Sequence, residues 1–175
     1  MSRPHGIILL GANGSGKSTI GRELSCALNY AHFDVEDYWF YKTGILYTAI
    51  RQSAERNEML LSDMKKHGLF VVSGDISGWS DEFLTVFDLA VLLTAPIEIR
   101  MKRIENREYA RWGDRVREGG DMYESQQKFR EFALTRDVGL LEHHALKYAC
   151  PVLRVDGAKT PEAIVSKIIK SIEEL

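Results

Sequence analysis

The chain has 175 residues, of which 45% are hydrophobic and 27% are charged, and its formal net charge is −2. This length suits one domain that buries about 70% of the surface its unfolded chain exposes, so a stable core needs neither disulfides nor a structural metal. The small net charge excludes the general basic field of a dedicated nucleic-acid-binding protein, and nucleic acid is not an expected partner.

Cysteine and histidine usage indicates an ordinary cytoplasmic protein. Cys26 and Cys150 lie far apart without Cys-x-x-Cys spacing, which predicts buried free thiols and a reducing compartment. His143 and His144 lack the spacing and the carboxylate companions of a metal site, and we interpret them as helix-end residues. No run approaches the ~20 apolar residues of a membrane span, so no membrane partner is expected. The oligomeric state is left open between monomer and homodimer.

The first apolar run, residues 6–10, leads directly into a glycine-rich segment. Residues 11–18 have the sequence G-A-N-G-S-G-K-S, which is the full G-x-x-x-x-G-K-[ST] pattern of a phosphate-binding loop, or Walker A motif. In such a loop the backbone N–H groups surround the phosphates, the lysine reaches the β- and γ-phosphates, and the serine hydroxyl binds Mg²⁺. A helix that begins near the lysine adds its positive dipole end. The candidate nucleotide-binding residues are therefore Gly11, Ala12, Asn13, Gly14, Ser15, Gly16, Lys17, Ser18 and Thr19, with Ser18 as a candidate Mg²⁺ ligand.

The second apolar run, residues 31–35, carries carboxylates at its end. Alternation along a strand would place Asp34 and Glu36 on one face. A carboxylate here can accept the proton of an acceptor hydroxyl or hold Mg²⁺ through water, and we take Asp34 as the first candidate base and Glu36 as the second. The alternative is that Glu36 and Asp37 begin the next helix, where acidic side chains interact favourably with the helix dipole.

The third apolar run, residues 69–73, ends in a loop with the sequence S-G-D-I-S-G. Its small residues allow the backbone at Gly74 to approach a substrate closely. Asp75 is a candidate for the carboxylate that orients the Mg²⁺ shell or contacts the substrate. The alternative is a turn that is rich in Gly, Ser and Asp for conformational reasons.

The fourth apolar run, residues 89–93, leads through Thr-Ala-Pro into a predicted helix with an arginine stripe. At 100° per residue, one side of this helix carries Arg100, Arg103, Arg107 and Arg111. Because like charges repel, such a stripe indicates an anion bound against it. The alternative is a solvated helix face on which the arginines pair with Glu98, Glu105 and Glu108.

An arginine-rich segment bounded by glycines follows at about residues 111–121, and its composition is typical of a mobile cover. When such a cover closes and excludes water, arginines can neutralise the charge on a transferring phosphoryl group. Arg107, Arg111 and Arg115 are the candidates for this role, and Arg107 is also a candidate nucleotide ligand.

The fifth apolar run, residues 151–155, ends in Asp156 and Gly157. Their backbone could line an adenine pocket, or they could form a plain Asp-Gly turn. The last helix is well signalled, because Thr160 can cap it and Pro161 suits its first position.

The alternation of these apolar runs with helical patterns predicts a parallel sheet with helices on both faces. We expect one α/β domain over residues 1–175, with three layers around a five-stranded parallel sheet. Ligands of such sheets bind outside the carboxyl ends of the strands, where the candidate residues fall.

These residues together resemble the nucleoside-monophosphate-kinase-like branch of P-loop kinases, which includes adenylate, shikimate and gluconate kinases and chloramphenicol phosphotransferase. The resemblance spans essentially the whole chain, and it rests on residues 11–18, on Asp88–Val91 with Pro96, Arg100, Arg103 and Arg107, on the arginine-rich cover, and on residues 155–157. It implies the P-loop NTPase fold, ATP and Mg²⁺ as co-substrates, a substrate-binding segment at about residues 38–67 and a short lid at about residues 111–121.

The chain departs from the monophosphate kinases after the second strand, where they place Ser or Thr and a phosphate-binding Arg. Carboxylates stand there instead, which favours an uncharged or lightly charged hydroxyl acceptor. Arg51 and Arg56 are candidates for binding an acidic group on the acceptor.

The leading hypothesis is an ATP-dependent kinase that transfers the γ-phosphoryl group to a hydroxyl of a small molecule. Lys17 and the loop amides would hold the phosphates, and Asp34 would contact the acceptor. Two alternatives remain, a nucleoside-monophosphate kinase and a nucleotide-binding regulatory protein with little phosphotransferase activity.

Overall fold

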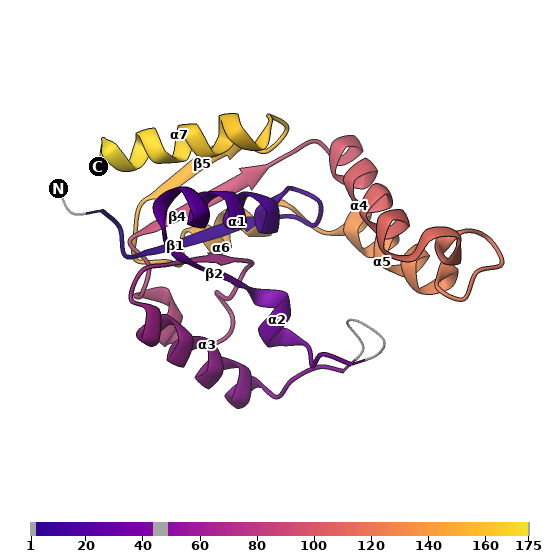
Figure 1. Cartoon of the computed structure of the whole chain (residues 1–175), viewed down its shortest axis with the longest axis horizontal. Coiled ribbons are helices and arrows are strands. Elements are labelled where there is room, and N and C mark those ends of the chain that lie inside the picture. Colours follow the sequence, from indigo (N-terminus) through magenta and orange to yellow (C-terminus); the bar gives the residue numbers. More distant parts are fainter. Residues whose placement is uncertain (1–2, 44–48, 175) are drawn as a thin grey trace.

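Five parallel strands form one twisted sheet in the computed structural model, which describes residues 3–43 and 49–174 (Figure 1). The strand order is β2-β3-β1-β4-β5, and each neighbouring pair is parallel. The strands are β1 (Gly6–Gly11), β2 (Ala31–Asp34), β3 (Phe70–Ser73), β4 (Leu89–Thr94) and β5 (Val152–Asp156). Each apolar run in the sequence coincides with a strand to within one residue, and the predicted five-stranded parallel sheet is confirmed.

The central strands are apolar up to their carboxyl ends because helices cover both faces of the sheet. All six residues of β1 are buried, as are all four of β3. In β1, Ile8 and Leu10 contribute to the core on one face, whereas Ile7 and Leu9 contribute to the core on the other. A single strand thus supports two separate hydrophobic layers.

Helices cover both faces of the sheet (Figure 1). On the first face lie α1 (Lys17–Leu28) and α7 (Pro161–Glu173). The opposite face is covered by α3 (Ser53–His67) and α6 (Gly139–Ala145), together with the 3₁₀ helix η1 (Asp81–Leu84). The predicted start of α7 is confirmed, since the Thr160 hydroxyl accepts a hydrogen bond from the Ala163 N–H at 3.4 Å and Pro161 is the first helical residue.

A pair of helices projects from the edge of this body (Figure 1). The predicted arginine helix is α4 (Ile97–Trp112), which is followed by the 3₁₀ helix η2 (Gly113–Val116) and by α5 (Tyr123–Thr135). The segment expected as a lid, about residues 111–121, forms the turn between α4 and α5. Sequence reasoning did not anticipate α5, so it missed that this turn ends a helical hairpin.

Two local expectations were wrong. The strand β2 ends at Asp34, and α2 (Val35–Trp39) begins at the next residue, so Asp34 and Glu36 do not alternate along one strand. The alternative stated above, in which Glu36 and Asp37 begin a helix, is what the structure shows. Cys26 and Cys150 are free thiols as expected, but Cys26 is exposed and Cys150 only half-buried. Within the described ranges, every helix is too short or too polar to cross a membrane.

Candidate functional site

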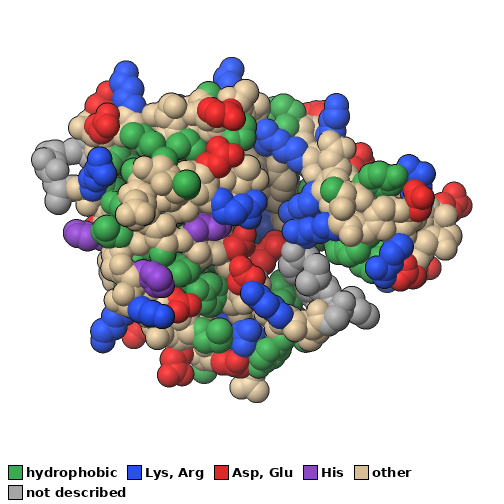
Figure 2. All heavy atoms as spheres, viewed as in Figure 1, with side chains coloured by type: hydrophobic (Ala, Val, Ile, Leu, Met, Phe, Trp, Pro, Cys, Tyr) green, Lys and Arg blue, Asp and Glu red, His purple; other side chains and the backbone are tan. Residues whose placement is uncertain are grey.

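A cavity of about 730 Å³ opens at the carboxyl ends of the strands, between the sheet and the helical hairpin. This volume is in the range of small-molecule sites. In Figure 2 basic side chains face acidic ones across the hollow beside the projecting hairpin. Among the residues that line it are Gly11, Asn13, Gly14, Ser15, Gly16, Lys17, Ser18, Thr19, Asp34, Glu36, Gly74, Asp75, Arg107 and Arg111, all of which the sequence predicted.

The phosphate loop has the backbone that its glycines allow. Gly14 and Gly16 have φ angles of +80° and +104°, a region that side chains with a Cβ rarely adopt. The loop closes on itself through a hydrogen bond of 3.0 Å from the Ser15 N–H to the Ala12 carbonyl. Because α1 begins at Lys17, its first N–H groups have no partner within the helix and are available to an anion. The Ser15 hydroxyl is buried without a hydrogen-bond partner among the described residues, which also suits a phosphate oxygen.

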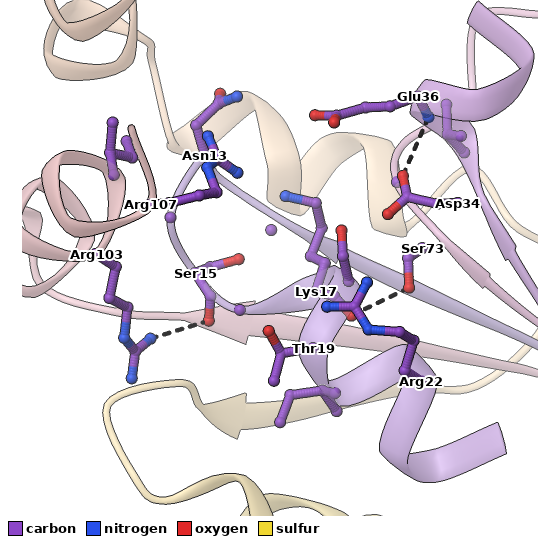
Figure 3. A pocket seen from close by; sticks show the side chains of 18 of the residues that line it. Asn13, Ser15, Lys17, Thr19, Arg22, Asp34, Glu36, Ser73, Arg103 and Arg107 are labelled. Atoms are coloured by element: carbon purple, nitrogen blue, oxygen red, sulfur yellow. Dashed lines mark hydrogen bonds between the residues drawn. The ribbon is translucent and has the colours of Figure 1, made fainter. Parts of the chain in front are cut away.

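Lys17 lies between a basic side and an acidic side of the cavity (Figure 3). Its ammonium donates a hydrogen bond of 3.1 Å to the Ala12 carbonyl. Burial lowers the pKa of Lys17 to about 8, with the positive charges of Arg136 and Arg107 acting in the same direction and Glu36 and Asp34 opposing them. The charged form of Lys17 is therefore disfavoured in this cavity, as is expected of a cation that binds an anionic ligand there.

Two arginines of the predicted stripe attach α4 to the phosphate loop. Arg100 is buried, and its guanidinium donates to the Asn13 carbonyl at 3.3 Å. Arg103 donates to the carbonyls of Ser15 at 3.3 Å and Gly157 at 2.8 Å. A Cβ on Gly14 would overlap the Arg100 carbonyl, so the loop and the helix are in direct backbone contact. Neither the anion interpretation nor the solvated-face alternative describes Arg100, because its partners are backbone carbonyls.

Further along α4, Arg107 and Arg111 line the cavity. From beyond α5 a third basic side chain, Arg136, joins them and donates a hydrogen bond of 2.9 Å to the side-chain oxygen of Asn13. Glu108, which the alternative offered as a partner for the stripe, is buried and forms an ion pair of 3.5 Å with Arg130 of α5.

Carboxylates form the opposite wall (Figure 3). Asp34 is the N-cap of α2, and its side chain accepts a hydrogen bond of 3.1 Å from the Glu36 N–H. Asp75 lies in the loop after β3, where one oxygen accepts a hydrogen bond of 2.9 Å from the Ser77 N–H. The strands β2 and β3 are neighbours, and Asp34 is paired with Ser73. This pairing brings the start of α2 and the loop after β3 to one side of the cavity.

The structure does not bring every predicted site residue to the cavity. Arg115 forms an ion pair of 2.6 Å with Asp121 in the turn of the hairpin. Arg51 donates to Glu55 at 2.6 Å and to the Tyr38 carbonyl at 3.1 Å. The guanidinium of Arg56 is buried against the rings of Trp39 and Trp79, at 4.0 and 4.5 Å.

Three further predicted residues contribute to the frame of the site instead of its lining. Ala12 is buried behind the loop. Asp156 accepts a hydrogen bond from the Ala158 N–H at 2.9 Å, which is the geometry of the Asp-Gly turn alternative. Gly157 packs against the Ser15 carbonyl. Part of the predicted substrate-binding segment, residues 44–48, lies outside the described residues.

Several lining residues were missed by sequence reasoning. Arg136 follows α5, far in sequence from any strand end, and no local pattern marks it. Ser73 donates a hydrogen bond of 3.0 Å to the Lys17 carbonyl, and its place at the last position of β3 could have identified it. The remaining missed lining residues of charge are Arg22 and Lys159.

The cavity does not contain a preformed protein cage for a metal. No cluster of three or more His, Cys, Asp or Glu side chains suited to a metal occurs among residues 3–43 and 49–174. The oxygens of Ser18, Asp34 and Asp75 do line the cavity. A hydroxyl with one or two carboxylates suits Mg²⁺, which usually takes its other ligands from substrate phosphates and water.

The sheet, the phosphate loop and the basic hairpin define a P-loop fold of the kinase type. Residues 7–128 match the protein family described as AAA domain, and the chain belongs to this family. The YqaC protein of Bacillus subtilis (strain 168) is 35% identical to this chain over 171 residues, which cover 93% of this chain and 94% of YqaC. A cytidylate kinase of Haloarcula marismortui is 28% identical over 130 residues, or 66% of each chain.

Solved structures share the fold. A shikimate kinase from Bacteroides thetaiotaomicron superposes with a TM-score of 0.59 at 16% identity, over 97% of this chain and 99% of that one. A gluconokinase from Sinorhizobium meliloti 1021 gives a TM-score of 0.55 at 18% identity, over 99% of this chain and 94% of the other. These likenesses confirm the predicted P-loop kinase fold.

Proposed function

We propose that the chain is an ATP-dependent kinase that transfers the γ-phosphoryl group of ATP to a hydroxyl of a small molecule. The observation that carries this proposal is the division of the cavity. The phosphate loop, Lys17 and the hairpin arginines form one side, and Asp34 and Glu36 form the other. Asp75 lines the same cavity from the loop after β3, the strand next to β2. Kinases that phosphorylate a hydroxyl combine a cationic cradle for the phosphates with a carboxylate that orients the acceptor hydroxyl and accepts its proton.

In this proposal Asp34 accepts the proton of the acceptor hydroxyl while that oxygen forms a bond to the γ-phosphorus. The bond between the γ-phosphorus and the β,γ-bridging oxygen breaks, and ADP leaves with that electron pair. Lys17 and the loop N–H groups hold the β- and γ-phosphates, and Arg107, Arg111 and Arg136 lie where they can stabilise the charge that develops.

Mg²⁺ fits the oxygen ligands described above, and when bound it would neutralise charge on the phosphates. Ser18 is its expected protein ligand, with Asp34 or Asp75 in contact through water. Lys159, Pro161 and Ile164 also line the cavity. This apolar and basic part of the lining would contact the nucleoside part of ATP.

The test is Mg²⁺-dependent ATP consumption across a panel of nucleosides, nucleoside monophosphates, sugar acids, shikimate and hydroxylated antibiotics. Stimulation by an alcohol that carries no phosphate supports the proposal, and the phosphorylated product identifies the acceptor. If only monophosphates stimulate turnover, the acceptor is a phosphate instead. If nothing stimulates turnover although ATP binds, a regulatory role replaces both.

A nucleoside-monophosphate kinase is the second candidate, and the similarity to the Haloarcula marismortui cytidylate kinase favours it. This function needs a cation for the acceptor phosphate. Arg51 and Arg56 were the candidates, but Arg51 is paired with Glu55 and Arg56 is packed between tryptophans. Arg22, which also lines the cavity, is a cation that remains for this role. The carboxylates of Asp34, Glu36 and Asp75 support a hydroxyl acceptor better than a phosphate.

We expect nucleotide binding near pH 8 to take up protons, because burial lowers the pKa of Lys17 to about 8 and part of Lys17 is therefore neutral there. A neighbouring triphosphate stabilises the ammonium and raises this pKa, so the neutral fraction becomes protonated on binding. Isothermal titration calorimetry with MgATP in buffers of different ionisation enthalpy measures the uptake. At pH 6 Lys17 is already charged, and its share of the uptake should vanish. Equal uptake at pH 6 and pH 8 would contradict the expected role of Lys17.

A further inference from the structure

The carboxylate of Asp75 is held by one side chain of α6 and by one backbone N–H of its own loop. His144 of α6 has its Nδ1 at 2.5 Å from one oxygen of Asp75. An ionised carboxylate can only accept, so the Nδ1–H donates this bond. The other oxygen of Asp75 is bound by the Ser77 N–H at 2.9 Å. Asp75 is largely buried, with 16% of its side chain exposed, and it nevertheless lines the cavity.

Tyr148, just after α6, completes this arrangement. Its hydroxyl oxygen accepts a hydrogen bond of 3.2 Å from the Ile76 N–H, directly beside Asp75. Burial and the negative charge of Asp75 raise the pKa of Tyr148, which keeps its hydroxyl protonated. The loop after β3 is therefore fastened at consecutive residues to the helix layer beneath it.

The contacts that hold Asp75 come from the helix layer opposite to the one that contains α1. Ile76 packs into the core on the face covered by α3 and α6. Lys17 and Ser18 come from α1, which covers the opposite face of the sheet. The carboxylate of Asp75 is thus held from the face that α1 does not cover, and it lines the same cavity as Lys17 and Ser18.

We propose that His144 is a positioning residue that holds Asp75 to bind the acceptor, through a hydroxyl or amino group other than the one that is phosphorylated. This inference rests on the proposed kinase function, because it concerns the acceptor half of the same cavity. Each carboxylate oxygen has two acceptor sites, and the bonds to Ser77 and His144 occupy one on each oxygen. Tyr148 also interacts with this carboxylate, so at least one of its four acceptor sites is left for a donor on the acceptor, while Asp34 takes the hydroxyl that attacks.

A matched set of variants tests this role. His144→Leu removes the donor and retains the volume, whereas His144→Asn places an amide N–H near the position of Nδ1. His143→Leu is the control, because His143 is the exposed neighbour whose Nδ1 lies 3.3 Å from the Gly139 carbonyl in its own helix. The fourth and fifth variants, Asp75→Ala and the double variant Asp75→Ala/His144→Leu, complete a cycle.

With the acceptor found in the panel, His144→Leu is expected to raise the acceptor KM about tenfold or more, the effect of weakening one charge-assisted hydrogen bond. The KM for ATP should stay within about twofold, His144→Asn should restore most of the loss, and the double variant should be no worse than Asp75→Ala. A purely structural histidine would change both KM values or neither. The inference is overturned if His144→Asn is as impaired as His144→Leu, or if the KM for ATP rises as much as that for the acceptor.

The pairing is also measured without any substrate, from urea unfolding of the same variants. The fold-changes in the unfolding constant should fail to multiply for Asp75→Ala and His144→Leu, as expected of two groups in contact. If the two fold-changes in the unfolding constant multiply, Asp75 and His144 are not coupled. The pairing is then overturned even if the chain is an active kinase. If the wild-type chain phosphorylates nothing but the cycle is non-multiplicative, the proposed function and the acceptor role of Asp75 fall together, while the contact stands.

Discussion

Replacing Lys17 with methionine is expected to lower phosphoryl transfer by about 10²–10³-fold, the typical cost of removing one donor that stabilises transition-state charge. Methionine keeps most of the length of the side chain but cannot contact the β- and γ-phosphates as a cation. Nucleotide affinity should also fall, because charge-assisted hydrogen bonds to the phosphates are lost. Turnover with the acceptor and calorimetric titration with ATP measure the two effects.

The same variant should unfold no more readily than the wild type at pH 7. The folded chain lowers the pKa of Lys17 from 10.5 to about 8, so the unfolded chain binds more protons between these values. The stability contributed by this group therefore rises from pH 8 to pH 10.5, and below pH 8 the charged amine opposes folding. Removing the amine removes that penalty.

Urea unfolding at pH 7 and pH 10 checks this expectation, with Lys170→Met as the control. Lys170 is an exposed lysine of α7 whose ammonium lies 3.9 Å from Glu174. A Lys17→Met chain that is strongly destabilised at pH 7, or that keeps turnover within tenfold of the wild type, would contradict the assignment of Lys17.

Replacing Asp34 with asparagine is expected to lower kcat by about 10²–10⁴-fold, the usual contribution of a general base, while nucleotide affinity stays within about threefold. The substitution is conservative for the fold. Asp34 caps α2 through the Glu36 N–H, and asparagine caps helices about as well as aspartate does. The loss would therefore report on the proton acceptor and not on the helix.

Asp37→Asn is the matched control for this measurement. Asp37 is an exposed carboxylate of α2, 3.6 Å from the Lys42 ammonium, and it does not line the cavity. We expect wild-type kinetics for this variant. If Asp34→Asn retains turnover while Glu36→Gln loses it, the base is Glu36. If both variants retain turnover, the acidic wall does not act in catalysis.

The sheet was predictable because its residues satisfy a local rule. Strands buried on both faces must be continuously apolar, and short runs such as Ile7–Leu10 and Val71–Val72 are typical of such strands. The phosphate loop was predictable for a related reason, since its glycines are required by backbone angles that Gly14 and Gly16 adopt. Each apolar run, like the glycine pattern of the phosphate loop, is contained within about ten consecutive residues.

The rest of the candidate site depends on contacts between distant segments. The side chain of Arg136 meets Asn13 across 123 positions of sequence, and His144 meets Asp75 across 69. No spacing rule marks either pair. The arginine stripe was correctly placed on a helix. The sequence could not show that Arg100 and Arg103 bind backbone carbonyls, because that depends on how α4 crosses the loop.

Arg100 and Arg103 hold α4 against the phosphate loop, and we call these hydrogen bonds the clamp. The clamp affects how far the hairpin moves when α4 rotates. Twelve residues of continuous helix separate Arg100 from Trp112, a length of about 18 Å. A rotation of about 10° at the clamp therefore displaces the far end of the helix by about 3 Å. The carbonyls of Asn13 and Ser15 are bound near the beginning of α4, and the turn of the hairpin follows its far end. Small adjustments of the loop are thus magnified at the point of the molecule farthest from the sheet.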